Sequence, residues 1–419
     1  MSLMVTSDFY VVILKWGLLK HLHMRMLVLV MLLSATFAPT VLADADWDDD
    51  GYLATIGSLR LEKGDEFGCY GMPHLSWKAD PGAVALECRD YIEERIDASI
   101  WDSKPISTYT PSGLNATQHT TIALQGFTVH GDETGQSSTA WHSASDVPNN
   151  ELDWHNLGRR GGSLEKGIAD VSSVESELDA GGLVNMYWIG RIYDATVRHD
   201  QDVIDMLSER DDVWFTTWGE AYSYWAMENC GSLNHSIVDG VLIISSIDSK
   251  SCRSAYNAWN IPLTWIVDIG SSQILDSDTK EIDSDESNTK EGWRQEGELI
   301  FVSLLAGNEI KFDLDGEDYE ILGTTQFFNN KSAAFTVAGH STTDLHRWSQ
   351  RFDDYDFLKF TWLVSPRELD DGLEWLPYAG VGVLLVSVSG IWLVLKKDAI
   401  EHSRAEDFID VVAGGDDDE

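Results

Sequence analysis

Apolar and polar positions follow two different periods along residues 44–230. In Pro81–Ile96 and Ser163–Leu178 the apolar residues recur every three or four positions, which is typical of half-buried helices. In Leu183–Tyr193 they form a compact run rich in aromatic and β-branched residues, which indicates a strand. Helices that alternate with strands are typical of βα units, so the pattern predicts an α/β domain with a mainly parallel sheet over residues 44–230.

The end of this region, Asp211–Trp225, is rich in aromatic residues. Thr217 and Glu220 have the T-x-x-E spacing of a capping box, which satisfies free amides at the start of a helix. From Trp218 to Trp225 the apolar residues are spaced as on one helix face. We therefore interpret the aromatic residues as the buried face of a capped helix and not as a platform for a ligand.

After Cys230 the pattern changes to short strands. The strand candidates share apolar runs bounded by turn residues, and they are 241–247, 261–269, 298–306, 309–314, 319–322, 333–339 and 357–364. Asp315-Gly316 lies between two of them and is a strong signal for a hairpin turn. The region 231–372 is therefore predicted to be a small β-sandwich.

The charge balance excludes one class of partner. The chain has 70 Asp and Glu residues against 29 Lys and Arg residues, for a net charge of -41. Nucleic acid requires a basic surface that neutralises phosphates, so we expect no nucleic-acid partner.

The sequence patterns at both ends of the chain predict that the protein is located at the membrane. Residues 1–43 end in a basic, apolar and small-residue pattern over Met24–Ala43, which is typical of a signal peptide, with Met24 as an alternative start. Leu376–Leu395 is free of charged residues and matches the thickness of a bilayer core, and lysines follow it. We expect a transmembrane helix at 373–397 and an acidic cytoplasmic tail at 398–419.

These features predict a single-pass type I protein of the cell membrane with most of its chain outside the cell. The lipid bilayer is then a partner through Leu376–Leu395, a glycan is a candidate ligand, and the sequence names no protein partner. The four cysteines fit an oxidising compartment. Of the three connectivities, nearest-neighbour pairing is the simplest, so we predict the disulfides Cys69–Cys88 and Cys230–Cys252.

Residues 202–225, DVIDMLSERDDVWFTTWGEAYSYW, resemble the closing segment of polysaccharide-deacetylase (NodB-homology) domains. The resemblance covers about 24 residues and implies a distorted (β/α) barrel over 44–230, followed here by the β-sandwich and the transmembrane helix. It also implies metal-dependent removal of acetyl groups from a glycan. That reaction uses a divalent ion to activate water, together with an acid and a base.

The catalytic and metal-binding motifs of the family match this sequence only with substitutions. The predicted strand Gly51–Glu62 is followed by Asp65 and Glu66 where the family has an Asp-Asp pair. The family's two histidines fall on Asp132 and Gln136, and His130 lies two residues early. The altered site would use Asp65 and Glu66 in catalysis, with Glu66, His130 and Asp132 as ligands of zinc or a similar ion.

Two other groups of residues are candidate sites. His142 and His155 are candidate metal ligands, but their spacing matches no compact ligand motif. Ser341, Asp344 and His346 lie too close together in one loop for a catalytic triad. Two classes of function remain. One is a membrane-anchored glycan deacetylase, and the other is a non-catalytic surface domain that binds glycans or proteins and needs no cofactor.

Overall fold

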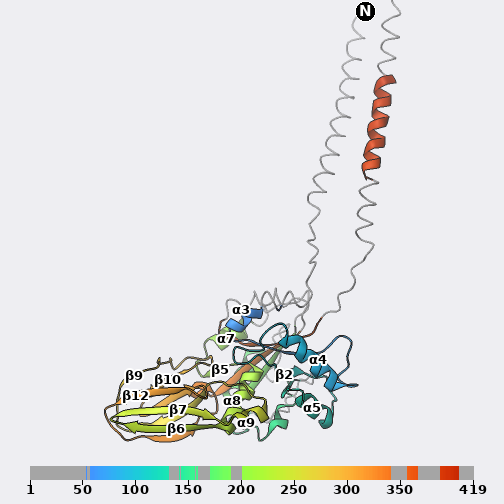
Figure 1. Ribbon diagram of the computed structural model, residues 1–419. Coiled ribbons are helices and arrows are strands. Elements are labelled where there is room, and N and C mark those ends of the chain that lie inside the picture. Colours follow the sequence, from blue (N-terminus) through green and yellow to red (C-terminus); the bar gives the residue numbers. More distant parts are fainter. Residues whose placement is uncertain are drawn as a thin grey trace, which may run out of the picture. The chain divides into compact units, whose positions relative to one another are not determined.

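The computed structural model describes residues 53, 57–131, 141, 143–155, 157–158, 170–189, 201–340, 356–366 and 387–404. The chain forms two units, Met1–Arg367 and Glu368–Glu419. All of the sheets described below belong to the first unit (Figure 1).

The centre of the first unit is a seven-stranded sheet in which every pairing is parallel. Its strands are β1 (Glu66–Cys69), β2 (Ser107–Tyr109), β3 (Val129–Gly131), β4 (Gly182–Ile189), β5 (Val213–Phe215), β14 (Ala333–His340) and β15 (Phe360–Val364). Their order is β3-β2-β1-β15-β14-β4, and β5 also pairs with the start of β14. The prediction of a mixed α/β fold with a parallel sheet is therefore confirmed.

Helices cover the two faces of this sheet unequally. On one face, the helices α4 (Pro81–Glu93), α5 (Ala116–Ala123), α6 (Val171–Asp179) and α7 (Gln201–Ser208) share a core with strand residues such as Phe67 and Phe335. On the other face, α8 (Trp218–Cys230) shares a core with Leu183 and Leu363. Successive residues of a strand point to opposite faces, so each strand contributes to both cores.

The aromatic helix forms as the sequence predicts. Trp218, Tyr222 and Trp225 are buried in α8, and the Thr217 side chain accepts a hydrogen bond from the backbone N–H of Glu220 at 3.2 Å. The Glu220 carboxylate, however, accepts hydrogen bonds from other groups, the Trp101 indole at 2.6 Å and the Thr216 hydroxyl at 2.9 Å. The cap at Thr217 is thus confirmed, whereas Glu220 does not act as the reciprocal half of a capping box.

The β-sandwich consists of two antiparallel four-stranded sheets. One contains β6 (Gly231–Val238), β7 (Val241–Asp248), β12 (Glu309–Leu314) and β9 (Ile274–Ser277). The other contains β10 (Gly292–Glu296), β11 (Leu299–Leu304), β8 (Leu263–Asp268) and β13 (Glu320–Thr324). Residues such as Ile244 and Phe312 of the first sheet share one core with Val267 and Val302 of the second. Figure 1 shows these strands side by side, with helix α9 (Lys250–Tyr256) at one end.

Strand pairing differs from the sequence analysis in two places. The predicted hairpin around Asp315-Gly316 is not formed, because β12 and β13 lie in different sheets. The predicted β-rich region 231–372 included the last two strands, whereas β14 and β15 pair with β4 and β1 in the parallel sheet. An apolar run identifies a strand but not its partner, since hydrogen bonding and burial can be satisfied in either sheet.

Two further local predictions have definite outcomes. Both disulfides are present, Cys69–Cys88 between β1 and α4 and Cys230–Cys252 between α8 and α9. The expected strand at Gly51–Glu62 is wrong at its end, because α3 (Ser58–Glu62) is a helix. That helix buries Arg60 and leaves Leu59 exposed, which is the reverse of the apolar alternation that suggested a strand.

Of the predicted transmembrane span, the structure describes only its second half, within a helix over 387–404. Among the described residues no helix is both long enough and apolar enough to cross a bilayer. The predicted signal peptide, residues 1–43, lies outside the described residues.

Candidate metal centre

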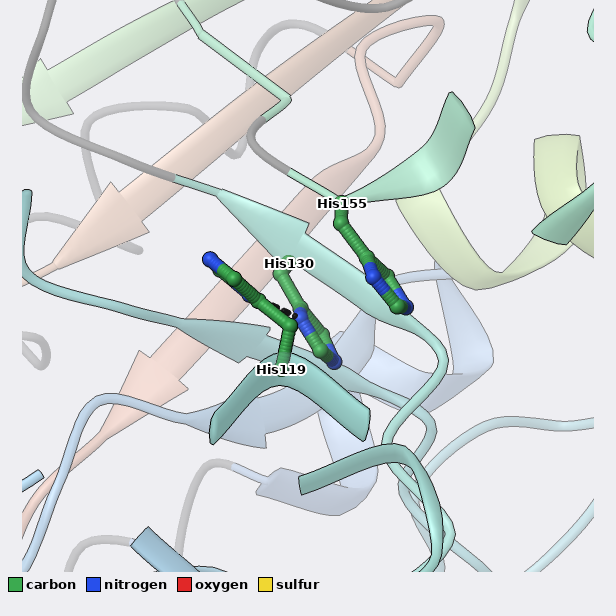
Figure 2. A group of neighbouring side chains, drawn as sticks. All are labelled: His119, His130 and His155. Atoms are coloured by element: carbon green, nitrogen blue, oxygen red, sulfur yellow. Dashed lines mark hydrogen bonds between the residues drawn. The ribbon is translucent and has the colours of Figure 1, made fainter. Parts of the chain in front are cut away.

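Three histidines from separate elements meet on the face of the sheet that α4 and α5 cover (Figure 2). His119 lies on α5, which Asn115 caps together with Gln118, and His130 lies in β3. His155 directly follows the 3-10 helix Glu151–Trp154. The nitrogen atoms that can bind a metal all lie within 4.8 Å of one another.

Two features hold His155 beside the other rings. The 3-10 helix before it is anchored by Trp154, which is fully buried and packs edge-on against Tyr222. After it, the backbone N–H of Leu157 donates to the carbonyl of His130 at 2.6 Å. Tertiary packing and this backbone bond therefore bring together histidines that are 25 residues apart in the sequence.

Hydrogen bonds determine which ring nitrogens carry protons. His130 Nε2 lies 2.9 Å from the carbonyl of Phe127, which can only accept, so Nε2 is the protonated nitrogen of His130. Its Nδ1 then carries a lone pair and accepts from Nδ1 of His119 at 2.8 Å. The ring of His155 stacks on His130, with ring centroids 4.2 Å apart. The lone pair of His130 therefore points into the cluster.

Burial favours the neutral form of two of the three rings, His130 and His155. His119, His130 and His155 are 4%, 0% and 7% exposed. Burial lowers the pKa of His130 well below its ordinary value, and a positive charge on His155 would lower it further. Burial, and then the neighbouring His119, lower the pKa of His155 to about 4. Neutral imidazole is the form that binds metals, so His130 and His155 have the required protonation state at neutral pH.

The donor set suits zinc, but the rings must rearrange to accept it. Nitrogens bound to tetrahedral zinc at about 2.1 Å are separated by about 3.4 Å, so the 2.8 Å between the two Nδ1 atoms must widen by about 0.6 Å. A metal lies in the plane of each ligating ring, whereas the planes of His130 and His155 are 4° apart. To bind a shared ion, one of these two rings must turn. The hydrogen bond between His119 and His130 must also break, because both Nδ1 atoms would then bind the ion.

The structure places the two predicted carboxylates away from this cluster. Phe67 and Cys69 of β1 face the core that also contains α4 and α5. Neighbouring residues of a strand point to opposite faces, so Glu66, the first residue of β1, faces α8. There its Oε2 atom accepts hydrogen bonds from the Thr217 hydroxyl and the Gly219 N–H, each at 2.7 Å. Glu66 and His130 therefore do not share a site.

Asp65 is held in a buried ion pair. Its carboxylate accepts from Arg60 Nε at 2.5 Å, from Trp362 Nε1 at 2.7 Å and from the Phe360 N–H at 3.0 Å. Asp65 is fully buried and Arg60 is 2% exposed. These contacts use both oxygens of the carboxylate and anchor Asp65 to Arg60 and to the start of β15.

Of the predicted ligands Glu66, His130 and Asp132, His130 belongs to the histidine cluster and Glu66 does not. Asp132 and His142 lie outside the described residues. The sequence suggests His155 as a ligand together with His142, and it gives no motif that includes His119. The available signal for His119 was its spacing of three residues from Ile122 on a helix, which turns it toward the core. No spacing within the sequence connects it to His155.

We expect Glu66 to make the stability of the fold depend on pH. Burial raises the pKa of Glu66 to about 7 from 4.5. Because the pKa is higher in the folded state, the stability that the protonated carboxyl contributes is complete below pH 4.5 and is lost as the pH rises through about 7. The free energy of unfolding of Glu66→Gln, measured relative to wild type at the same pH, should therefore increase by about 2–3 kcal/mol from pH 5 to pH 8.

Denaturant unfolding of both proteins at several pH values measures this difference. Subtracting the two curves removes other titrating groups, such as Glu228, whose pKa burial also raises to about 7. A difference that stays constant across this range would contradict the prediction.

In comparisons with known proteins, no family model, curated protein or solved structure matches this chain.

Proposed function

We propose that the α/β domain binds a divalent ion, zinc or a similar metal, through His119, His130 and His155. The observation that carries the proposal is the hydrogen bond from His130 Nε2 to the carbonyl of Phe127. Metal-binding histidines commonly donate their second ring nitrogen to a carbonyl or a carboxylate, which fixes the ring and its tautomer. Here that bond leaves Nδ1 of His130 facing His119, with His155 stacked alongside.

The proposed reaction is hydrolysis assisted by this metal. Three histidine ligands leave a fourth position on zinc for water, and zinc lowers the pKa of bound water to about 7. The proposed substrate is an acetylated glycan, and the support for it is the resemblance of residues 202–225 to polysaccharide deacetylases. The protein would then be a metal-dependent deacetylase-like enzyme.

A non-catalytic domain that binds glycans or proteins is the second candidate. Its support is the burial of the cluster, in which no ring is more than 7% exposed. Among the described residues, no acidic side chain joins the three histidines to act as a base. In this case the metal would stabilise the fold without meeting a substrate.

Elemental analysis of the purified full-length chain tests metal binding. We expect about one zinc ion per chain after dialysis, and we expect His130→Ala to lose it, because only two ligands remain. The control is His235→Ala, since His235 is exposed on β6 and hydrogen-bonds Tyr319 in the sandwich. Zinc-free wild-type protein, or a His130→Ala variant with full zinc content, would refute the proposal.

Acetate release and the melting temperature, measured on the same samples, distinguish the two candidate functions. Release of acetate from an acetylated chitooligosaccharide by the zinc-loaded protein, lost in His130→Ala, would support the enzyme. Zinc that raises the melting temperature without any acetate release would favour the non-catalytic domain.

The proposed location is the cell membrane, with a type I orientation. Its support is that the helix over 387–404 exposes a group of large apolar side chains, namely Val388, Ile391, Trp392, Leu393, Val394 and Leu395. We expect the full chain to stay in the membrane pellet after an alkaline carbonate wash. A chain that ends before Leu376 should be released, and release of the full chain would contradict the anchor.

A further inference from the structure

A cavity of about 490 Å³ opens between the α/β domain and helix α9. Its walls come from α4, the end of α5, the segment before β2, and residues 253–259. This volume lies in the range of about 300–1,000 Å³ that small-molecule sites occupy. The histidine cluster does not line it, so the cavity is separate from the candidate metal centre.

The charge of the cavity differs from that of the whole chain. Its lining contains the cations Arg89, Lys104 and Arg253 and the acidic residues Glu93 and Asp102. In the chain, acidic residues outnumber basic ones by 70 to 29. On so acidic a surface a small anion is repelled unless the site has a cation without an acidic partner, so the pairing of these three cations decides where an anion can bind.

The three cations are not equally available to a ligand. Arg253 is paired with Asp248, with 2.5 Å between Nε and Oδ2. Arg89 donates to the carbonyl of Gln125 at 3.1 Å and to Asp90 at 3.2 Å, and its Nε lies 3.9 Å from a carboxylate oxygen of Glu93. Lys104 has an exposed side chain, and among the described residues no ion pair or side-chain hydrogen bond holds it. Lys104 is therefore the cation best placed to bind an incoming anion.

The backbone that carries Lys104 is fixed in position. The carbonyl of Lys104 accepts a hydrogen bond from Nε1 of Trp259 at 3.0 Å, and its N–H donates to Asp102 Oδ1 at 3.0 Å. Trp259 is buried, and its N–H donates to the Ser223 hydroxyl on α8. Two walls of the cavity are thus joined by a hydrogen bond, which holds the site in shape before any ligand binds.

We propose that this cavity binds a small carboxylate that also carries hydroxyl groups, such as a uronic acid. The ammonium group of Lys104 would bind the carboxylate. Glu93, Asp102 and the amide side chain of Asn257 line the same space and offer acceptors for hydroxyl groups. The inference does not rest on the metal centre, so its failure leaves the proposed function unchanged.

Isothermal titration calorimetry on the full-length chain in detergent tests the site. The probes are D-glucuronate, inorganic phosphate and D-glucose. We expect glucuronate to bind more tightly than either of the others, and Lys104→Gln to weaken it about tenfold, the effect of losing one charged hydrogen bond. Lys104→Arg keeps the charge and should retain binding.

The matched control is Lys311→Gln, because Lys311 is 48% exposed on β12 of the sandwich and pairs with Glu309. It should bind glucuronate like wild type, and thermal melts should show that every variant is folded. Wild-type protein that binds no glucuronate, or equal affinity in wild type and Lys104→Gln, would overturn the site. Phosphate binding as tightly as glucuronate would overturn the assignment to a hydroxylated carboxylate.

Discussion

Replacing Trp225 by alanine is expected to lower the free energy of unfolding of the first unit by about 3–5 kcal/mol. Trp225 is 3% exposed, and its Nε1 donates to the carbonyl of Pro148 at 2.9 Å. Its ring packs against Tyr222, Trp154 and Tyr256. The substitution removes the indole from all of these neighbours, and domains are typically stable by only about 5–15 kcal/mol.

Denaturant unfolding followed by far-ultraviolet circular dichroism measures this loss. Leu152→Ala is the control, because Leu152 is 62% exposed in the 3-10 helix that contains Trp154. It should change the free energy of unfolding by less than about 0.5 kcal/mol. If Trp225→Ala unfolds like wild type but no longer binds a ligand, the aromatic residues form a recognition surface, and their assignment to the core fails.

Asp65→Asn is expected to destabilise the same unit by about 3–5 kcal/mol, because it breaks a buried ion pair by removing one partner. The amide keeps the shape of the carboxylate but leaves the Arg60 guanidinium, which is 2% exposed, without its counter-charge. It also weakens the hydrogen bonds from Trp362 and from the Phe360 N–H. The pair connects the α3–β1 turn to the start of β15, so the loss should affect the whole sheet.

Asp356→Asn provides the matched control, since Asp356 is 83% exposed and pairs with Lys63 on the surface. Surface pairs contribute about 0–1 kcal/mol, so this variant should remain close to wild type. The double variant Arg60→Met with Asp65→Asn should be more stable than Asp65→Asn alone, because no charge is then left alone in the core and the amide oxygen can still accept a hydrogen bond from Trp362 or the Phe360 N–H. If Asp65→Asn keeps wild-type stability but loses acetate release, Asp65 is a catalytic base and its structural role is refuted.

Residues near one another in the sequence were sufficient to predict the local structure. The period of apolar residues identified α4 and α8, and the short spacing between cysteines led to both disulfides. Thr217 was predicted as a helix cap for the same reason, since a cap depends on groups within one turn. The acidic composition, the predicted signal peptide and the predicted span at Leu376–Leu395 are also properties of the sequence alone.

Strand partners and the candidate site depended on the tertiary structure. Nothing local indicates that β14 and β15 return to the parallel sheet after the whole sandwich, because an apolar strand satisfies its hydrogen bonds equally well in either sheet. Glu66 and His130 were combined from a motif, but their strands turn them to opposite faces. His119 and His155 joined His130 only through the packing of α5 and Trp154. A metal site needs atoms a few ångströms apart, and the fold alone sets those distances for residues far apart in the chain.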